Sequence, residues 1–183
     1  MMFQQDSDKL MDMSELSLKK RMSPLLLSML IILLDQISKA LVVMYIPYRT
    51  VGFSLWGDFF RLIYVKNTGV AFSLGDQFLP VVRIVLFILT PLGIMGYLAY
   101  YLVSSREESK LQKFCLAGIV GGGLGNLIDR IFRPDGVVDF LDIRFYGLFG
   151  MERFPTFNIA DSSIVVCGIL LFISLWIKEK NTK

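Results

Sequence analysis

The sequence predicts an all-α membrane protein with four transmembrane helices and a small extracytoplasmic β-rich hairpin region. The chain has 183 residues, of which 54% are hydrophobic and only 19% are charged, where soluble domains carry roughly 25% charged residues. Its mean hydropathy is +0.58. At this length we expect one domain, at residues 23–178, between a polar cytoplasmic tail at 1–22 and a short cytoplasmic tail at 179–183.

The first membrane segment covers residues 24–45 and follows a basic cluster at 19–21. Its length matches the roughly 20 residues that a helix needs to cross the hydrocarbon core. A cleaved signal peptide is the alternative for an apolar stretch near the start of a chain. Charged residues follow the apolar part at 25–34 and no small-x-small cleavage site is present, so we favour a membrane-spanning helix.

Residues 46–66 are not a span, because apolar residues there alternate with small or polar ones, as at Val51 and Phe53. Gly57 and Asp58 can turn the chain, and an aromatic and β-branched run follows them. This pattern predicts a short hairpin lying at the membrane interface.

Three further spans are predicted at residues 80–103, 114–132 and 158–177. The loop before the third span is short and charged. The stretch 133–157 is rich in glycine, proline and aromatic residues, and we expect it to be irregular.

The third span has two overlapping small-xxx-small spacings, Gly118 with Gly122 and Gly121 with Gly125. Small residues at this spacing let another helix approach closely. We therefore expect tight helix packing along this span.

Lysine and arginine are unevenly divided between the two sides of the predicted bundle. Ten lie on the side of the N-terminal tail, the middle loop and the C-terminus, against six on the other side. By the positive-inside rule, both termini are expected in the cytoplasm, and the hairpin and the 133–157 stretch face outward. The formal net charge of +3 needs no nucleic-acid partner.

Histidine is absent, which excludes the Ser-His-Asp and Cys-His nucleophile systems and His-ligated zinc. Cys115 and Cys167 each lie within an apolar run, so we expect neither a disulfide nor a thiolate metal cluster. We expect no metal and no cofactor.

Polar side chains inside the spans need an explanation, because an Asp or Lys at the centre of a membrane helix costs about 2.5–3.5 kcal/mol on insertion scales. In the first span, Asp35 and Lys39 lie one helical turn apart, where a structural ion pair and direct substrate contact are both open roles. In the third span, Asn126, Asp129 and Arg130 share one helix face. We predict that they form a buried polar network that holds neighbouring backbone or carboxylates.

Three aspartates lie toward the outer side: Asp139 and Asp142 in the 133–157 stretch, and Asp161 at the head of the fourth span, after Asn158. Two carboxylates that share a site repel each other, which raises one pKa, so that one is protonated while the other is a base. Such a pair can activate water for peptide hydrolysis. An ion pathway or a structural role is the alternative from spacing alone.

Five motifs occur in one order along residues 24–178. They are Asp35-Gln36-Ile37-Ser38-Lys39, Asn67-Thr68-Gly69-Val70-Ala71-Phe72, the glycine-rich run from Gly121 to Arg130, Val137-Val138-Asp139-Phe140, and Phe154-Pro155-Thr156-Phe157-Asn158-Ile159-Ala160-Asp161. On a four-span frame, this set resembles the bacterial lipoprotein signal peptidase family, signal peptidase II.

The resemblance implies a membrane aspartic endopeptidase that cleaves prolipoproteins before a cysteine carrying diacylglycerol. It implies that Asp139 and Asp161 are the catalytic dyad and that no metal takes part. The positions expected to bind substrate or support the site are Asp35, Lys39, Asn67, Gly122, Asn126, Asp129, Arg130, Asn158 and Ala160.

The expected partners are lipid-modified prolipoproteins and membrane lipids, and the chain is expected to act as a monomer in the bacterial inner membrane. The alternative function is a proton-coupled small membrane transporter, which would also place Asp, Asn and Arg in its spans. A transporter would show inverted repeats and a midplane site, whereas this sequence has no evident repeat and its carboxylates cluster toward one side.

Overall fold

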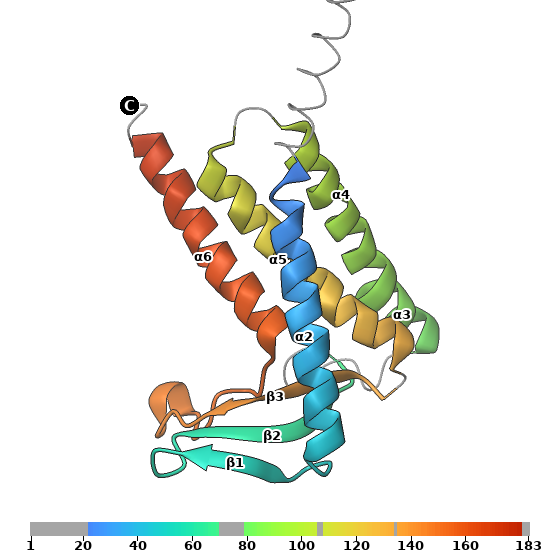
Figure 1. The fold of residues 1–183 in the computed structure, drawn as a ribbon, viewed down its shortest axis with the longest axis vertical. Helices are drawn as coiled ribbons and strands as arrows, with labels where there is room; N and C mark the ends of the chain where they lie inside the picture. The colour runs from blue at the N-terminus through green and yellow to red at the C-terminus, as the bar shows by residue number, and fades with distance from the viewer. Residues whose placement is uncertain (1–21, 70–78, 106–107, 134, 181–183) are drawn as a thin grey trace, which may run out of the picture.

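The computed structural model describes residues 22–69, 79–105, 108–133 and 135–180. Nearly all of the predicted tail at 1–22 lies outside these ranges, and so do Val70, Ala71 and Phe72 of the second motif. Figure 1 shows a bundle of long helices with a small sheet lying across one end. The start of α2 and the end of α6 lie together at the opposite end (Figure 1).

The described part of the chain contains four helices long and apolar enough to cross a membrane, which confirms the predicted fold class. The helical elements are α2 (Leu25–Tyr45), α3 (Pro80–Ile84), η2 (Val85–Leu89), α4 (Thr90–Ser104), α5 (Lys110–Phe132) and α6 (Ile159–Lys180). The second span combines α3, η2 and α4, and η2 is a π-helical turn.

The third span begins at Lys110, four residues before the predicted start at 114. A capping box sets this start, because the Ser109 hydroxyl accepts from the Gln112 N–H at 3.2 Å and the Gln112 side chain accepts from the Ser109 N–H at 2.9 Å. These two bonds satisfy backbone donors that a helix start leaves unpaired. The predicted start at 114 marks the beginning of the apolar stretch, and the helix extends four residues before it. Helix α6 likewise continues to Lys180, three residues past the predicted span end at 177.

The sheet has three antiparallel strands in the order β1-β2-β3: β1 (Val51–Leu55), β2 (Phe60–Asn67) and β3 (Val137–Ile143). The first two form the predicted hairpin. The third strand corrects the expectation that 133–157 is irregular. It forms because β3 pairs with β2 from a distant part of the chain, with Asp139 opposite Val65.

Helix α5 is the central helix of the bundle, and its two glycine spacings pack against two different helices. A methyl group at Gly118 or Gly122 would collide with α6, at Cys167 and at the carbonyl oxygen of Ala160. A methyl group at Gly121 would lie 2.8 Å from the Cα atom of Ser28 in α2. The prediction of tight packing is confirmed, and it explains how polar groups on three helices come within hydrogen-bonding distance.

Gly122→Ala is expected to destabilise the protein by about 1–3 kcal/mol, the usual effect of overpacking. The new methyl group would meet backbone, which cannot rotate away. Thermal unfolding in detergent measures the effect. Gly93→Ala in α4 is the matched control, since beyond its chain neighbours and its own helix backbone no atom of the described residues lies within 4 Å of a methyl group there. Equal melting temperatures for the two variants would contradict the close α5–α6 contact.

Candidate active site

Asp139 and Asp161 lie near each other, where the sheet meets the start of α6. The link between them is Asn158, which is fully buried. Its side-chain Nδ2 donates to Asp139 Oδ1 at 2.7 Å, and its backbone N–H donates to Asp161 Oδ2 at 3.2 Å. One residue therefore contacts both carboxylates.

Two further asparagines occupy the remaining carboxylate oxygens. Asn67, at the end of β2, donates to Asp139 Oδ2 at 3.1 Å. Asn126 of α5 donates to Asp161 Oδ1 at 2.7 Å, and its own oxygen accepts from Lys39 Nζ at 3.0 Å. A lysine ammonium only donates, so Lys39 must bond to the oxygen of the Asn126 amide. The NH₂ group of Asn126 is then left to donate to Asp161.

The environment of Asp139 favours its protonated form. Its side chain lies on β3 and is almost completely buried. Burial, and then the negative charge of Asp161, raise the pKa of Asp139 from its ordinary value of 3.8 to about 7, against the opposing hydrogen bonds from Asn67 and Asn158. At neutral pH this carboxyl group can therefore both donate and accept a proton.

A fully buried ion cluster lies behind the two aspartates. Lys39 Nζ is 2.8 Å from Asp35 Oδ2 and 3.1 Å from Asp129 Oδ2, and all three side chains are 0% exposed. For Asp35 and Lys39 this arrangement supports the structural ion pair over direct substrate contact.

Each carboxylate of this cluster holds the backbone next to one of the two site aspartates. Asp35 Oδ1 accepts from the N–H of Ala160, at 3.0 Å, and Ala160 precedes Asp161. Asp129 Oδ2 accepts from the N–H of Val138, also at 3.0 Å, and Val138 precedes Asp139. The cluster thus determines where α6 and β3 place the two carboxylates.

Gln36 is a residue of this cluster to which the sequence analysis gave no role. Its Nε2 lies 3.2 Å from Asp35 Oδ2, 3.1 Å from Asp129 Oδ1 and 3.0 Å from the carbonyl oxygen of Gly125. Its position inside the Asp35–Lys39 motif was the available signal.

Arg130 does not join the ion cluster, although it shares a helix face with Asn126 and Asp129. Its guanidinium donates to the carbonyl oxygen of Phe87 at 3.3 Å and lies 5.3 Å from the centre of the Phe87 ring. Phe87 is in the π-helical turn η2. Asp129 pairs instead with Lys39 and, at 3.3 Å, with Arg133. The predicted single network is therefore divided, and Arg130 connects the third span to the second.

Asp142 lies in a separate ion cluster toward the far end of the sheet. It receives Arg61 of β2, with Nη2 at 2.6 Å, and Arg153, with Nε at 2.7 Å, and it is almost completely buried. Arg153 also donates to the carbonyl oxygen of Asp58 in the hairpin turn. This cluster anchors the segment that leads to Asn158. Sequence reasoning missed both arginines, since nothing local marks them as partners of Asp142.

No group of three His, Cys, Asp or Glu side chains in the described ranges could hold a metal ion. The site itself consists of two neighbouring carboxyl groups and the amides around them. Two such carboxyl groups, one of them favoured in its protonated form, can activate a water molecule.

A four-span bundle with paired aspartates at one end fits the class of membrane-embedded peptidases. Comparison with known proteins agrees, because the family described as signal peptidase (SPase) II matches residues 27–177. The chain belongs to the signal peptidase II family and is a protease of that type. The transporter alternative finds no support.

Relatives and a solved structure match most of the chain. Lipoprotein signal peptidases from Treponema pallidum (strain Nichols) and Treponema denticola are 44% and 46% identical, each over 163 residues. These alignments cover 89% and 87% of this chain and 88% and 94% of the relatives. A solved bacterial membrane enzyme is 26% identical with a TM-score of 0.75, covering 88% of this chain and 92% of the other.

Proposed function

We propose that this protein removes the signal peptide from diacylglyceryl-modified prolipoproteins by cleaving just before the lipidated cysteine, with Asp139 and Asp161 as the catalytic dyad. The observation that carries the proposal is the shared contact of both aspartates with Asn158, with Ala160 and Val138 held by the buried ion cluster. The names of the relatives support the substrate class.

The different exposure of the two carboxyl groups suggests their roles. Asp139 is nearly fully buried and carries the proton, whereas Asp161 is partly exposed, so that water can reach it. Asp161 accepts a proton from water, and the water oxygen attacks the scissile carbonyl carbon. Asp139 donates its proton to the carbonyl oxygen, which completes a tetrahedral diol.

The second step restores both groups. Asp161 gives its proton to the leaving nitrogen as the carbon–nitrogen bond breaks. Asp139 takes back a proton from one diol hydroxyl as the new carboxyl group forms. Because one carboxyl must be protonated and the other ionised at the start, the rate depends on the shared proton.

The supporting side chains act by positioning. Asn67, Asn126 and Asn158 orient the carboxylates, and Asp35, Lys39 and Asp129 hold the backbone around them. Gly122 and Ala160 let α5 and α6 come close, and Arg130 holds the second span against the third. We propose these as site-supporting residues.

The proposed location is the bacterial inner membrane, with both termini cytoplasmic and the site toward the extracytoplasmic side. The lysine and arginine bias supports this orientation. The start of α2 and the end of α6 lie at the same end of the bundle, opposite the sheet (Figure 1). This arrangement also supports the proposed orientation. We propose that the protein acts as a monomer, with residues 23–178 as its peptidase domain.

Incubation of the purified protein with a lipidated prolipoprotein tests the function. We expect release of the signal peptide, detected by mass spectrometry, with the diacylglyceryl cysteine at the new N-terminus. The control substrate is the same prolipoprotein without its lipid, which should remain intact. Cleavage at another bond, or equal cleavage of both substrates, would contradict the proposal.

Cleavage is expected to slow as pH rises through about 7, because the raised pKa of Asp139 means that the shared proton is lost in that range. The same shift affects stability. Between about pH 4 and 7 the folded state binds more protons at Asp139 than the unfolded state, so the unfolding free energy falls as pH rises through this window.

The pH dependence of the cleavage rate and of the melting temperature measure these two effects. Asp139→Asn should flatten the melting-temperature profile near pH 7, since it removes the titrating group. An unchanged profile in that variant would assign the effect to another residue.

A further inference from the structure

A hollow lies between the last turns of α2, the end of α5 and the sheet. Its volume is about 580 Å³. The residues that line it are Ala40, Val43, Met44, Tyr64, Lys66, Phe132, Arg133, Asp135, Gly136 and Val138. Val138 is next to Asp139 on β3, and successive side chains of a strand point to opposite faces, so this hollow and the active site lie on different sides of the strand.

The hollow has an apolar wall on its membrane side. Ala40, Val43 and Met44 come from α2 and Phe132 from α5, and all four are exposed on the helices that span the membrane. The helices end here, at Tyr45 and Phe132. The hollow therefore lies where hydrocarbon gives way to headgroups, and a lipid chain can lie against this wall.

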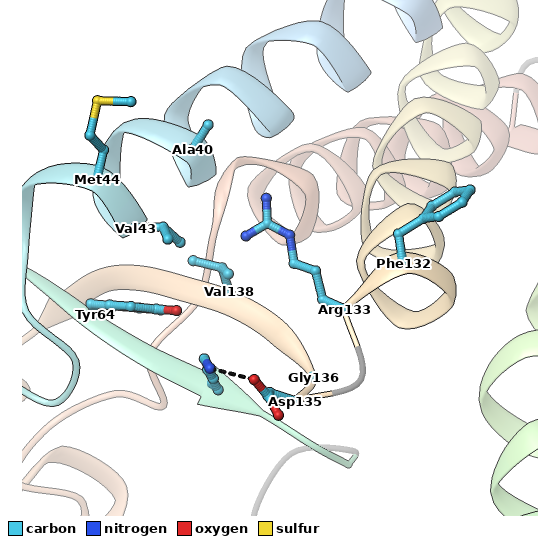
Figure 2. Close-up of a pocket in the computed structure, with 10 residues that line it drawn as sticks. Ala40, Val43, Met44, Tyr64, Phe132, Arg133, Asp135, Gly136 and Val138 are labelled. Atoms are coloured by element: carbon cyan, nitrogen blue, oxygen red, sulfur yellow. Dashed lines mark hydrogen bonds and ion pairs between the residues drawn. The ribbon is translucent and has the colours of Figure 1, made fainter.

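The opposite part of the hollow carries two cations. Figure 2 shows Arg133 extending from the end of α5 into the space between α2 and β3. Lys66 comes from β2, and the two side chains are 30% and 26% exposed. Cations beside an apolar wall match an amphiphile with an anionic headgroup.

Each cation has an acidic partner that leaves it able to bind more. Arg133 reaches Asp129 through Nε, at 3.3 Å, which leaves the outer guanidinium nitrogens toward the hollow. Lys66 pairs with Asp135 at 2.7 Å, but the Asp135 side chain is 68% exposed. An exposed pair is weak, so a phosphate can replace Asp135 as the partner of Lys66.

We propose that this hollow binds an anionic phospholipid, with the phosphate between Lys66 and Arg133 and an acyl chain along Ala40, Met44 and Phe132. A neutral diacylglyceryl group has no charge to pair with the two cations. The phosphate contact therefore favours an anionic lipid over this neutral group. The proposal does not depend on the proposed cleavage reaction.

Lipid binding to the purified full-length protein in detergent tests the proposal by native mass spectrometry. The probes are dioleoyl-phosphatidylglycerol, dioleoyl-phosphatidylcholine and dioleoylglycerol. We expect phosphatidylglycerol to bind several-fold more tightly than either of the other two. Equal binding of phosphatidylglycerol and phosphatidylcholine would overturn the proposal.

Charge variants should change phosphatidylglycerol binding in opposite directions. Lys66→Gln is expected to weaken it about fivefold, the factor for one cation at an anionic membrane surface. Asp135→Asn is expected to strengthen it, because it removes the competing carboxylate. Lys110→Gln, at the other end of the bundle, is the matched control and should bind like the wild type; a loss equal to that of Lys66→Gln would show only general surface attraction and would overturn the site.

Two more variants separate binding from folding. Lys66→Arg keeps the charge and should retain binding. Ala40→Trp fills the hollow without changing charge and should reduce binding at least as much as Lys66→Gln. Wild-type binding by Ala40→Trp would show that the lipid lies elsewhere and would overturn the proposal.

Discussion

Asp139→Asn and Asp161→Asn are each expected to lower the cleavage rate by at least about 10²–10⁴-fold, the usual contribution of general acid–base catalysis. Asparagine nearly preserves the shape of aspartate but cannot carry the shared proton. Because the two groups act as a unit, the double variant should be scarcely slower than either single variant. Release of signal peptide from a lipidated prolipoprotein measures the rate.

Substrate binding and folding should survive these substitutions. In each variant the new amide NH₂ group faces a hydrogen-bond donor. At position 139 this donor belongs to Asn67 or Asn158. At position 161 it belongs to Asn126 or Asn158. One hydrogen bond is lost at each site, so we expect a melting temperature only slightly below that of the wild type. A rate within tenfold of wild type in either variant would contradict the dyad.

The control for the dyad is an aspartate whose loss leaves the fold intact. Asp135→Asn fits, because its side chain is largely exposed and pairs only with Lys66 among the described residues. Asp142→Asn is the natural choice from sequence position, but Asp142 is buried between Arg61 and Arg153. We expect Asp142→Asn to lower stability while the folded protein retains activity.

Lys39→Met is expected to produce the largest loss of stability, about 3–5 kcal/mol, which is typical of removing one partner from a buried ion pair. Asp35 and Asp129 would remain as two neighbouring buried carboxylates without their shared cation. Asn126 would also lose the donor that orients its amide toward Asp161. Thermal unfolding and cleavage should therefore both be impaired.

Removing the negative charges of Asp35 and Asp129 should restore part of that stability. The triple variant Lys39→Met, Asp35→Asn and Asp129→Asn has no buried charge in the cluster and keeps an oxygen for the N–H groups of Ala160 and Val138. Its melting temperature should exceed that of Lys39→Met. Lys110→Met, at an exposed lysine, is the matched control; a similar loss there would refute the importance of burial.

The sequence by itself determined the four spans, the β1–β2 hairpin and the glycine surfaces of α5, because each depends on residues close together in the chain. Hydropathy over a window of one helix is sufficient to locate a span. The five motifs also marked most of the polar residues that surround the dyad.

Only the tertiary structure decided which of these residues meet. Asp35 caps the N–H of Ala160, and β3 forms by pairing with β2. No local pattern encodes either contact, since each joins segments far apart in the chain. For this reason the local pattern of residues 133–157 predicted an irregular segment.

Asp139 and Asp142 show the consequence most clearly. They are three residues apart on β3 and equally buried, yet one contacts Asn158 and the other lies between two arginines. Residues at this spacing point to opposite faces of a strand. Composition and spacing marked Asp139, Asp142 and Asp161 as candidates, and the family resemblance implied that Asp139 and Asp161 are the dyad. The strand that places Asp139 and Asp142 in separate sites exists only because β2 is there to pair with it.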